Sequence, residues 1–537
     1  REDETVTTVK IDGRSLTLDD VRAVARDPHV TAECTTEAAE AMRASRDLKL
    51  RLIATGDPIY GVTTGFGDSA HRQISADKAA DLQRNMILYH LNGTGPLAPD
   101  EVVRATLLIR ANCLARGNSG VRPEIAGRLL ELLRHDILPA VPERGSVGAS
   151  GDLIPLCYVA AALIGEGDVR HRGALRRTRD VFDSVGLTAL GLEAKDGLAL
   201  INGTSFSAAY AVLAAHDARR LAALADICTA LASEALLGNR GHYAAFIQDQ
   251  RPHPGQRASA RLIGALLEGS HLSLPHSQIV TAAGSLDGQG YTQLRRSIQD
   301  RYSLRCAPHV NGVLRDTLAW TWNWLETEIN ASTDNPLFDT AGETVHSGGN
   351  FYAGHVAQSM DALKVAVANV ADLLDRQLEL LVDEKFNNGL TPNLIPRLPP
   401  GDREAGLHHG FKGMQIAASA LTAEALGTSS PASVHSRSTE AHNQDKVSLA
   451  PIAARQARSV VALAHEVAAI HLLAACQALD LRGPHHMSPR TRAVHRAIRE
   501  AVPFLDRDQR LDHAISEVLG LVTAGVITEA AETAVTH

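Results

Sequence analysis

Three small residues and an acid, Ala149-Ser150-Gly151-Asp152, lie in a glycine-rich stretch of this chain. Glycine and other small side chains let a backbone fold tightly on itself. In such a turn the Gly151 nitrogen can attack the Ala149 carbonyl carbon and close a five-membered ring, and loss of water from Ser150 leaves an exocyclic methylene. The same residues also suit a surface loop before a helix capped by Ser150 or Asp152. The stretch therefore predicts either an ordinary loop or an electrophile that no ordinary side chain supplies.

The longer string around the tripeptide, GSVGASGDLIPL at residues 145–156, resembles the signature of the aromatic amino-acid ammonia-lyase and aminomutase family. In that family the Ala-Ser-Gly segment matures into a 4-methylidene-imidazol-5-one (MIO) prosthetic group. The resemblance therefore implies MIO formed from Ala149, Ser150 and Gly151, with no metal and no nucleotide. It extends from about residue 55 to about residue 460 through further blocks in the family's order: Tyr60–Gly67, Gly197–Ser205, Tyr302–Arg305, Thr333–Pro336, His346–Phe351 and Asn443–Asp445.

Long apolar patterns at helical spacing occupy much of the chain after residue 200. Residues 356–384 carry apolar side chains at steps of three and four, which predicts a helix about 43 Å long. Similar patterns predict helices at 205–237 and 452–481, and helices of this length bury their faces best against each other. The resemblance implies an all-α fold of the fumarase/aspartase-like type, with an N-terminal MIO-bearing domain at 1–200, which includes a lid loop, and a helix bundle at 201–537.

Shorter helices are expected before the bundle, and one segment is expected to interrupt it. The patterns and caps predict helices at 36–54, 78–92, 99–116, 122–135 and 153–165. The segment 250–300 is rich in His, Pro, Gly and Gln and is expected to be the main irregular interruption.

The charge and composition exclude several classes of function. A net charge of -8 gives no basic field for nucleic acid or a membrane surface. No uncharged apolar run is long enough to cross a membrane, and no apolar run follows a basic start as in a signal peptide. Six scattered cysteines predict reduced thiols in a cytoplasmic protein. Adjacent histidine pairs such as His408-His409 do not face one site, so no metal is expected.

The resemblance assigns a role to each candidate site residue. Tyr60, in the lid, matches the catalytic base, although a free tyrosine titrates near 10 and must be activated to work near neutrality. Arg305 matches the clamp on the substrate carboxylate, for which its planar fork is suited. The remaining matches form the polar and aromatic shell of the pocket: Gly67, Asn202, Tyr302, Asn335, Phe351, Glu424 and Gln444. From the residues alone, a lone arginine is equally a salt bridge and a buried amide equally a structural link.

Tyr89-His90 matches the pair that contacts the far end of the substrate side chain. Two polar tips there favour a hydroxylated ring, because phenylalanine would leave them without a partner unless they bond each other or water. We therefore expect tyrosine or a ring-substituted relative as substrate. Histidine lyases differ from this chain in having Gln at the position of Ser205, and Asn-Gln-Glu-Asp where Asn443-Gln-Asp445 stands. Histidine is therefore the less expected substrate.

The expected reaction is loss of ammonia from an aromatic L-amino acid to give a trans-arylacrylate. The small-molecule amino acid is the expected partner, and the family is homotetrameric with active sites shared between subunits. Two alternatives remain. One is a 2,3-aminomutase that makes a β-amino acid, against which the aliphatic Ile416 argues because the aminomutases compared place Tyr there. The other is a non-catalytic helical scaffold, against which the intact tripeptide, base and clamp argue.

Overall fold

The computed structural model describes residues 7–533, and residues 1–5, on which the signal-peptide expectation rests, lie outside them. The described chain is mainly helical, as predicted, and it separates into two units. Unit 1 contains residues 7–216, Trp320–Ala362 and Pro431–Arg458; unit 2 contains Asp217–Ala319, Leu363–Ser430 and residues 459–533. Each unit is assembled from separate stretches of chain. The division into consecutive domains at residue 200 stays a prediction.

Unit 1 combines short helices with small two- and three-stranded sheets. Its own helices are α1 (Leu18–Arg26), α2 (Thr36–Ala54), α3 (Ala79–Tyr89), α4 (Asp100–Ala115), α5 (Pro123–Arg134), α6 (Leu153–Leu163), α7 (Thr178–Val185) and α8 (Asp196–Ile201). The strands are β1 (Thr8–Ile11), β2 (Thr31–Cys34), β3 (Thr94–Leu97), β4 (Ile137–Pro139), β5 (Pro142–Arg144), β6 (Asp168–His171), β7 (Ala174–Arg177), β8 (Leu337–Asp339) and β9 (Thr344–His346). β1 and β2 pair in parallel; β3–β5, β4–β6–β7 and β8–β9 pair antiparallel.

Helix α4 lies at the centre of unit 1. Every residue from Val102 to Ala115 is buried, and the helix packs against α1, α2 and α5. A helix that is buried all round must satisfy its polar side chains internally. Asn112 does so by accepting a hydrogen bond from the Gly13 amide at 2.9 Å and donating to the Ile329 carbonyl at 2.8 Å. The helix therefore ties the N-terminal turn to a helix more than 200 residues later in the chain.

Four long helices have residues in both units: α9 (Ser205–Ala235), α14 (Ala307–Ile329), α15 (Gly354–Val382) and α17 (Ala450–Arg482). Their bounds lie within about two residues of the predicted ones for α9, α15 and α17. Unit 2 also contains α10 (Ala245–Asp249), α11 (Pro254–Leu266), α12 (His276–Ala283), α13 (Tyr302–Arg305), α16 (Lys412–Thr428), α18 (Pro489–Ala501), α19 (Asp512–Thr523) and α20 (Val526–Thr533). The expectation that 250–300 is irregular is wrong for α11 and α12. In α11 Pro254 starts the helix, and its apolar face buries Ile263 and Leu266.

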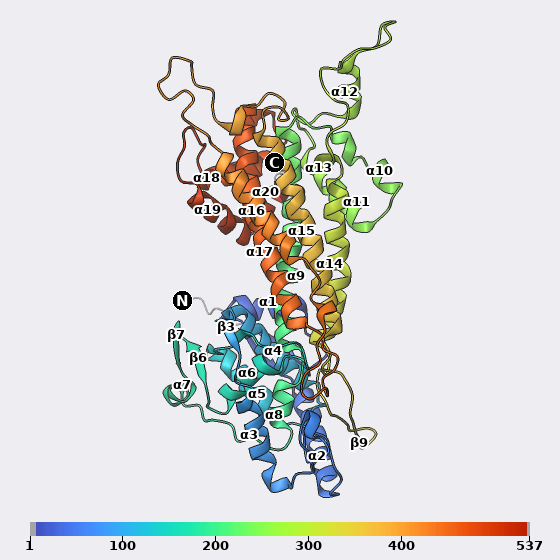
Figure 1. Ribbon diagram of the computed structural model, residues 1–537, viewed down its shortest axis with the longest axis vertical. Helices are drawn as coiled ribbons and strands as arrows, with labels where there is room; N and C mark the ends of the chain where they lie inside the picture. The colour runs from blue at the N-terminus through green and yellow to red at the C-terminus, as the bar shows by residue number, and fades with distance from the viewer. Residues whose placement is uncertain (1–6, 534–537) are drawn as a thin grey trace. The chain divides into compact units, whose positions relative to one another are not determined.

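In unit 2 the long helices run side by side and are joined by buried polar contacts (Figure 1). Gln377 of α15 donates to Thr229 of α9 at 3.0 Å and accepts from His471 of α17 at 3.0 Å. Burial lowers the pKa of His471 to about 3, so the ring stays neutral and donates from Nε2. Helix α17 alone in the described chain is long and apolar enough to cross a membrane, yet 72% of its apolar window is buried in the protein.

Asp226 of α9 is the most heavily used of these polar groups. It is fully buried and accepts hydrogen bonds from Ser259 of α11 at 2.5 Å and from Asn311 and Arg315 of α14 at 2.8 and 2.6 Å. We expect Asp226→Ala to destabilise the protein by about 3 kcal/mol, because the cation and two donors lose their partner.

Thermal unfolding at fixed protein concentration measures the Asp226→Ala effect. Asp249→Ala is the matched control, because Asp249 forms a half-exposed pair with Arg257 that is worth at most about 1 kcal/mol. Equal Tm values for the two variants would contradict the prediction.

Candidate functional site

A pocket of about 570 Å³ in unit 1 gathers most of the predicted site residues. The predicted residues that line it are Tyr60, Gly67, Tyr89, His90, Ala149, Ser150, Asn202, Asn335, Phe351 and Gln444. They come from segments that are distant in sequence, and Gln444 lies with its amide nitrogen 3.4 Å from the Ser150 hydroxyl. All the family blocks except Tyr302–Arg305 therefore meet at the Ala-Ser-Gly segment.

The Ala-Ser-Gly segment is a tight and largely buried turn. Ser150 and Gly151 have φ of 51° and 78°, in the left-handed region, and Ala149 is buried. Gly151 pairs with Gly203, and the Asp152 amide donates to the Gly203 carbonyl at 2.6 Å. A Cβ at Gly151 would lie 2.1 Å from that carbonyl oxygen, so only glycine fits.

Asp152 does not act as the helix cap that the ordinary-loop interpretation would require. It precedes α6, but its side chain makes no capping bond. Its carboxylate instead accepts from the amide and hydroxyl of Ser207 at 2.7 and 3.0 Å. Burial raises the pKa of Asp152 to about 7, against the hydrogen bonds from Ser207. The turn is thus anchored to the start of α9.

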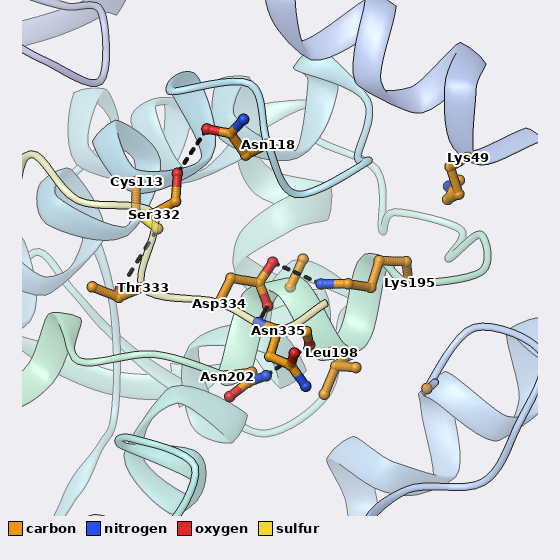
Figure 2. A network of polar contacts seen from close by, with 12 residues as sticks. Lys49, Cys113, Asn118, Lys195, Leu198, Asn202, Ser332, Thr333, Asp334 and Asn335 are labelled. Carbon is orange, nitrogen blue, oxygen red and sulfur yellow. Dashed lines mark hydrogen bonds and ion pairs between the residues drawn. The ribbon is translucent and has the colours of Figure 1, made fainter. Parts of the chain in front are cut away.

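Asn202 and Asn335 are joined directly at the pocket wall (Figure 2). The Asn202 amide nitrogen donates to the Asn335 carbonyl at 2.9 Å, and the Asn335 side-chain oxygen accepts from Gly348 at 2.7 Å. Behind them Lys195 and Asp334 form a fully buried ion pair at 2.6 Å. The Asn202 side-chain oxygen is buried without a hydrogen-bond partner in the described chain. That oxygen can therefore accept a further hydrogen bond.

Arg110, from the buried helix α4, holds the same loops from the other side. Its guanidinium donates only to backbone carbonyls, including Ala199 at 3.0 Å, Asn202 at 3.2 Å and Thr333 at 3.3 Å. These acceptors lie at the end of α8 and in the loop that carries Asn335. One buried side chain thus sets the separation of the two segments that carry the asparagines.

These features fit the MIO group. The turn has a glycine where no side chain fits, a small residue before the serine, and an orphaned amide oxygen at the pocket wall. The left-handed φ values at Ser150 and Gly151 make this segment a tight turn, as the cyclisation of Ala149, Ser150 and Gly151 requires.

Tyr60 lies in the pocket, and its hydroxyl accepts a hydrogen bond from the Gly67 amide at 3.0 Å. Burial raises the pKa of Tyr60, and the negative charge of Glu440 raises it further, whereas the Gly67 amide opposes both. The Gly67 amide therefore offsets only part of the upward shift in the pKa of Tyr60.

Glu440 is a pocket residue that the sequence analysis missed. It accepts from the Asp68 amide at 3.3 Å and from Asn443 at 2.9 Å, which joins the Asn443-Gln-Asp445 block to the lid. It starts a run of left-handed residues, with φ of 52° at Glu440, 50° at Ala441 and 65° at His442. The sequence shows an acidic residue just before that block. The direction of its side chain depends on the left-handed backbone, which the local sequence does not indicate.

His90 has only one of its two ring nitrogens left for a substrate. The His90 Nδ1 is 2.9 Å from the Met86 carbonyl, which can only accept, so Nδ1 carries the proton. The Tyr89 ring packs on His90 with centroids 4.4 Å apart and remains 58% exposed. Burial lowers the pKa of His90, which keeps the ring neutral. What remains for a substrate is the acceptor at His90 Nε2, beside the Tyr89 residue that also lines the pocket.

Tyr302, Arg305 and Glu424 belong to unit 2 and do not line the pocket. Tyr302 is 72% exposed, and the Arg305 guanidinium stacks on its ring at 4.6 Å while donating to the Asp300 carbonyl at 3.0 Å. Glu424 lies on an exposed face of α16. Their roles in substrate binding stay predictions.

Gly203 offers a test of this geometry. A Cβ there would lie 2.0 Å from Arg110 Nη1 and 2.3 Å from the Thr333 carbonyl, both held in place. We expect Gly203→Ala to displace the Asn202 loop and to lower Tm by several degrees, since overpacking costs about 1–3 kcal/mol. Gly127→Ala in α5 is the control, because nothing lies within 4 Å of its Cβ and alanine favours the helix. Equal Tm values would contradict the assigned packing.

The sequence and fold match known proteins along the whole chain. The family model for aromatic amino acid lyases matches residues 16–500. A histidine ammonia-lyase of Stigmatella aurantiaca is 39% identical over 98% of each chain, and one of an Anaeromyxobacter is 41% identical over 96% of this chain and 99% of its own. The crystal structure of a tyrosine aminomutase from Streptomyces globisporus is 37% identical over 98% of each chain, with a TM-score of 0.92.

These matches contradict the expectation of tyrosine or a ring-substituted relative as substrate, because full-length relatives at 36–41% identity are histidine ammonia-lyases. The argument from the Tyr89-His90 pair failed because the acceptor at His90 Nε2 suits a ring N–H group as well as a ring hydroxyl. Ser205, which had argued against histidine, is buried in α9 and does not touch the pocket.

The match along most of the chain and the shared helical fold lead to one conclusion: this chain belongs to the aromatic amino acid lyase family and is a carbon–nitrogen lyase.

Proposed function

We propose that the protein is a histidine ammonia-lyase that converts L-histidine to ammonia and trans-3-imidazolylacrylate (urocanate). The family assignment and the full-length similarity to histidine ammonia-lyases support this substrate. The structural observation that carries the proposal is the hydrogen bond from His90 Nδ1 to the Met86 carbonyl.

That hydrogen bond determines what His90 can recognise. With the proton held on Nδ1, Nε2 is an acceptor, and a substrate ring that carries an N–H group can donate to it. The imidazole of L-histidine has such a donor, whereas the ring of phenylalanine has none. A site built to accept a hydrogen bond discriminates strongly against a ligand that lacks the donor.

The MIO group formed from Ala149, Ser150 and Gly151 would supply an electrophilic carbon that turns the substrate amine into a leaving group. Tyr60 acts as the base that removes the β-proton. Because its pKa is raised, the phenolate that accepts this proton is populated mainly at alkaline pH. Asn202 and Asn335 hold polar atoms at the amine, and Phe351 packs beside the ring. Gln444 orients the Ser150 position, and Gly67 keeps the Tyr60 hydroxyl in place.

The proposal extends to the assembly and its location. The family resemblance implies a homotetramer with active sites shared between subunits, in which Tyr302, Arg305 and Glu424 complete the binding of amine and carboxylate. The small-molecule amino acid is the partner, and the protein acts in the cytoplasm.

Product analysis tests the reaction and the prosthetic group together. With L-histidine, L-tyrosine and L-phenylalanine offered separately, we expect free urocanate and equimolar ammonia from L-histidine alone. Intact mass should show the deficit that cyclisation and dehydration leave, and Ser150→Ala should abolish both the deficit and turnover. A product with the same mass as the substrate would show that the protein is an aminomutase. Preferred turnover of L-tyrosine or L-phenylalanine would show that the assigned substrate is wrong.

His90 gives a second, sharper prediction. Replacing it with leucine removes the acceptor, so we expect the KM for L-histidine to rise about 10-fold, the value of one hydrogen bond. In the unaltered enzyme the same loss should appear only at acid pH. Because the pKa of His90 is lowered, protonation removes the Nε2 acceptor only below the ordinary imidazole value of 6.5.

Steady-state kinetics across pH checks both statements about His90. His513→Leu, an exposed histidine of α19, is the control and should leave KM unchanged. A KM in His90→Leu equal to that of the control would show that His90 does not read the substrate ring.

A further inference from the structure

Gln83 is a buried side chain of α3 that lies beside the pocket without lining it. Its exposed fraction is 0%, and both ends of its amide are used. The amide nitrogen donates to the Gly61 carbonyl at 3.0 Å, and the amide oxygen accepts from the Leu198 amide at 2.8 Å. One side chain thus bridges two backbone segments that are far apart in sequence.

The two backbone partners belong to the segments that carry the reaction. Gly61 follows Tyr60 directly and has φ of 63°. A Cβ at Gly61 would lie 2.4 Å from Leu198 Cδ2, so the two segments are in close contact as well as bridged. Leu198 lies in α8, the helix that ends just before Asn202, and its side chain lines the pocket.

The helix that carries Gln83 also supplies the residues that face the substrate ring. Met86, Tyr89 and His90 follow within two turns of Gln83 and line the pocket. On the side of α8, a Cβ at Gly197 would lie 3.0 Å from Gln83, so the helices approach closely there. The Gln83 amide therefore lies where the base segment, the Asn202 helix and the helix of the ring-contacting residues meet.

The chemistry of the bridge requires an amide. One partner is a carbonyl and the other an N–H group, so the side chain must donate and accept at fixed positions. Each buried hydrogen bond of this kind contributes modestly to stability, but misplacing a catalytic group by about 1 Å can cost about 100-fold in rate. A bridge between the base and the Asn202 helix therefore matters more for rate than for folding.

We propose that Gln83 is a positioning residue that sets the distance between Tyr60 and the Asn202 side of the pocket. This inference rests on the proposed function, in which Tyr60 is the base. Gln83 touches neither the substrate nor the reacting atoms; it acts through the backbone of Gly61 and Leu198.

The test replaces Gln83 by methionine, which keeps the shape and removes both hydrogen bonds. Gln477→Met is the matched control, since Gln477 is equally buried, donates to the Leu394 and Leu505 carbonyls and accepts from the Leu505 amide in unit 2. We expect both variants to fold, with similar losses in Tm, and to keep the mass deficit of the prosthetic group. Only Gln83→Met should lose kcat, by at least about 10-fold, with a much smaller change in KM.

Two further readouts separate positioning from a structural role. The alkaline rise of kcat should move to higher pH in Gln83→Met, because a displaced Tyr60 loses the Gly67 amide that lowers its pKa. The Tyr60 resonance in a ¹³C-tyrosine spectrum, assigned with Tyr60→Phe, follows the same pKa without turnover.

The inference would be overturned if Gln83→Met had the same kcat and the same Tyr60 pKa as Gln477→Met. Loss of the mass deficit in Gln83→Met would also overturn it, because Gln83 would then act in ring formation. Absence of turnover and of the mass deficit in the wild type would overturn the proposed function. In that case the Tyr60 titration alone decides whether Gln83 positions Tyr60.

Discussion

The backbone contact between Gly151 and Gly203 is the constraint on which the site depends. Neither residue tolerates a side chain, because each faces fixed atoms at about 2 Å from where a Cβ would stand. The contact places the Ala-Ser-Gly turn against the end of α8, beside Asn202, and the Asp152 amide closes it with a bond to the Gly203 carbonyl. The turn holds its left-handed conformation because the packing and hydrogen bonds around it exclude other conformations.

Buried polar groups around the turn bind the backbone of the site loops, and one buried pair of side chains supports them. Arg110 binds carbonyls at the end of α8 and in the loop before Asn335, and the Lys195–Asp334 pair lies behind that loop. Gln83 does the same between the Tyr60 segment and the start of α8. Leaving any of these groups without partners costs more than the bonds contribute, so they favour a single arrangement of the loops.

The pocket also shows how a neighbouring carbonyl alters what a side chain can recognise. Either ring nitrogen of a neutral His90 could be the acceptor, but the hydrogen bond to the Met86 carbonyl holds the proton on Nδ1 and leaves Nε2 as the acceptor. In this state His90 can only accept a hydrogen bond from a ligand. Tyr89, adjacent in sequence, is directed largely to solvent and stacks on the histidine ring. The substrate inference from the pair alone was wrong because an acceptor at Nε2 does not distinguish a ring hydroxyl from an imidazole N–H group.

Local sequence determined the secondary structure well. The bounds of α2, α9, α15 and α17 follow from helical periodicity and from caps such as Thr35, because those signals act within a few residues. The meeting of Tyr60, Ser150, Asn202 and Gln444 in one pocket was expected from the resemblance between motif blocks. Periodicity alone could not have placed them together, since it carries no information about contacts between distant segments.

Only the tertiary structure decided which polar atoms remain available. It fixed the His90 proton on Nδ1 through a hydrogen bond to the Met86 carbonyl, turned Glu440 toward the lid, buried Ser205 away from the pocket, and joined Gln83 to two distant backbone segments. It also placed Arg305 and Glu424 in the other unit from the pocket. Each outcome depends on long-range packing around the Gly151–Gly203 contact. The sequence by itself determined which chemical groups this protein has. The packing decided which of them face the pocket, because some donors and acceptors form hydrogen bonds with the backbone and others stay available for a ligand.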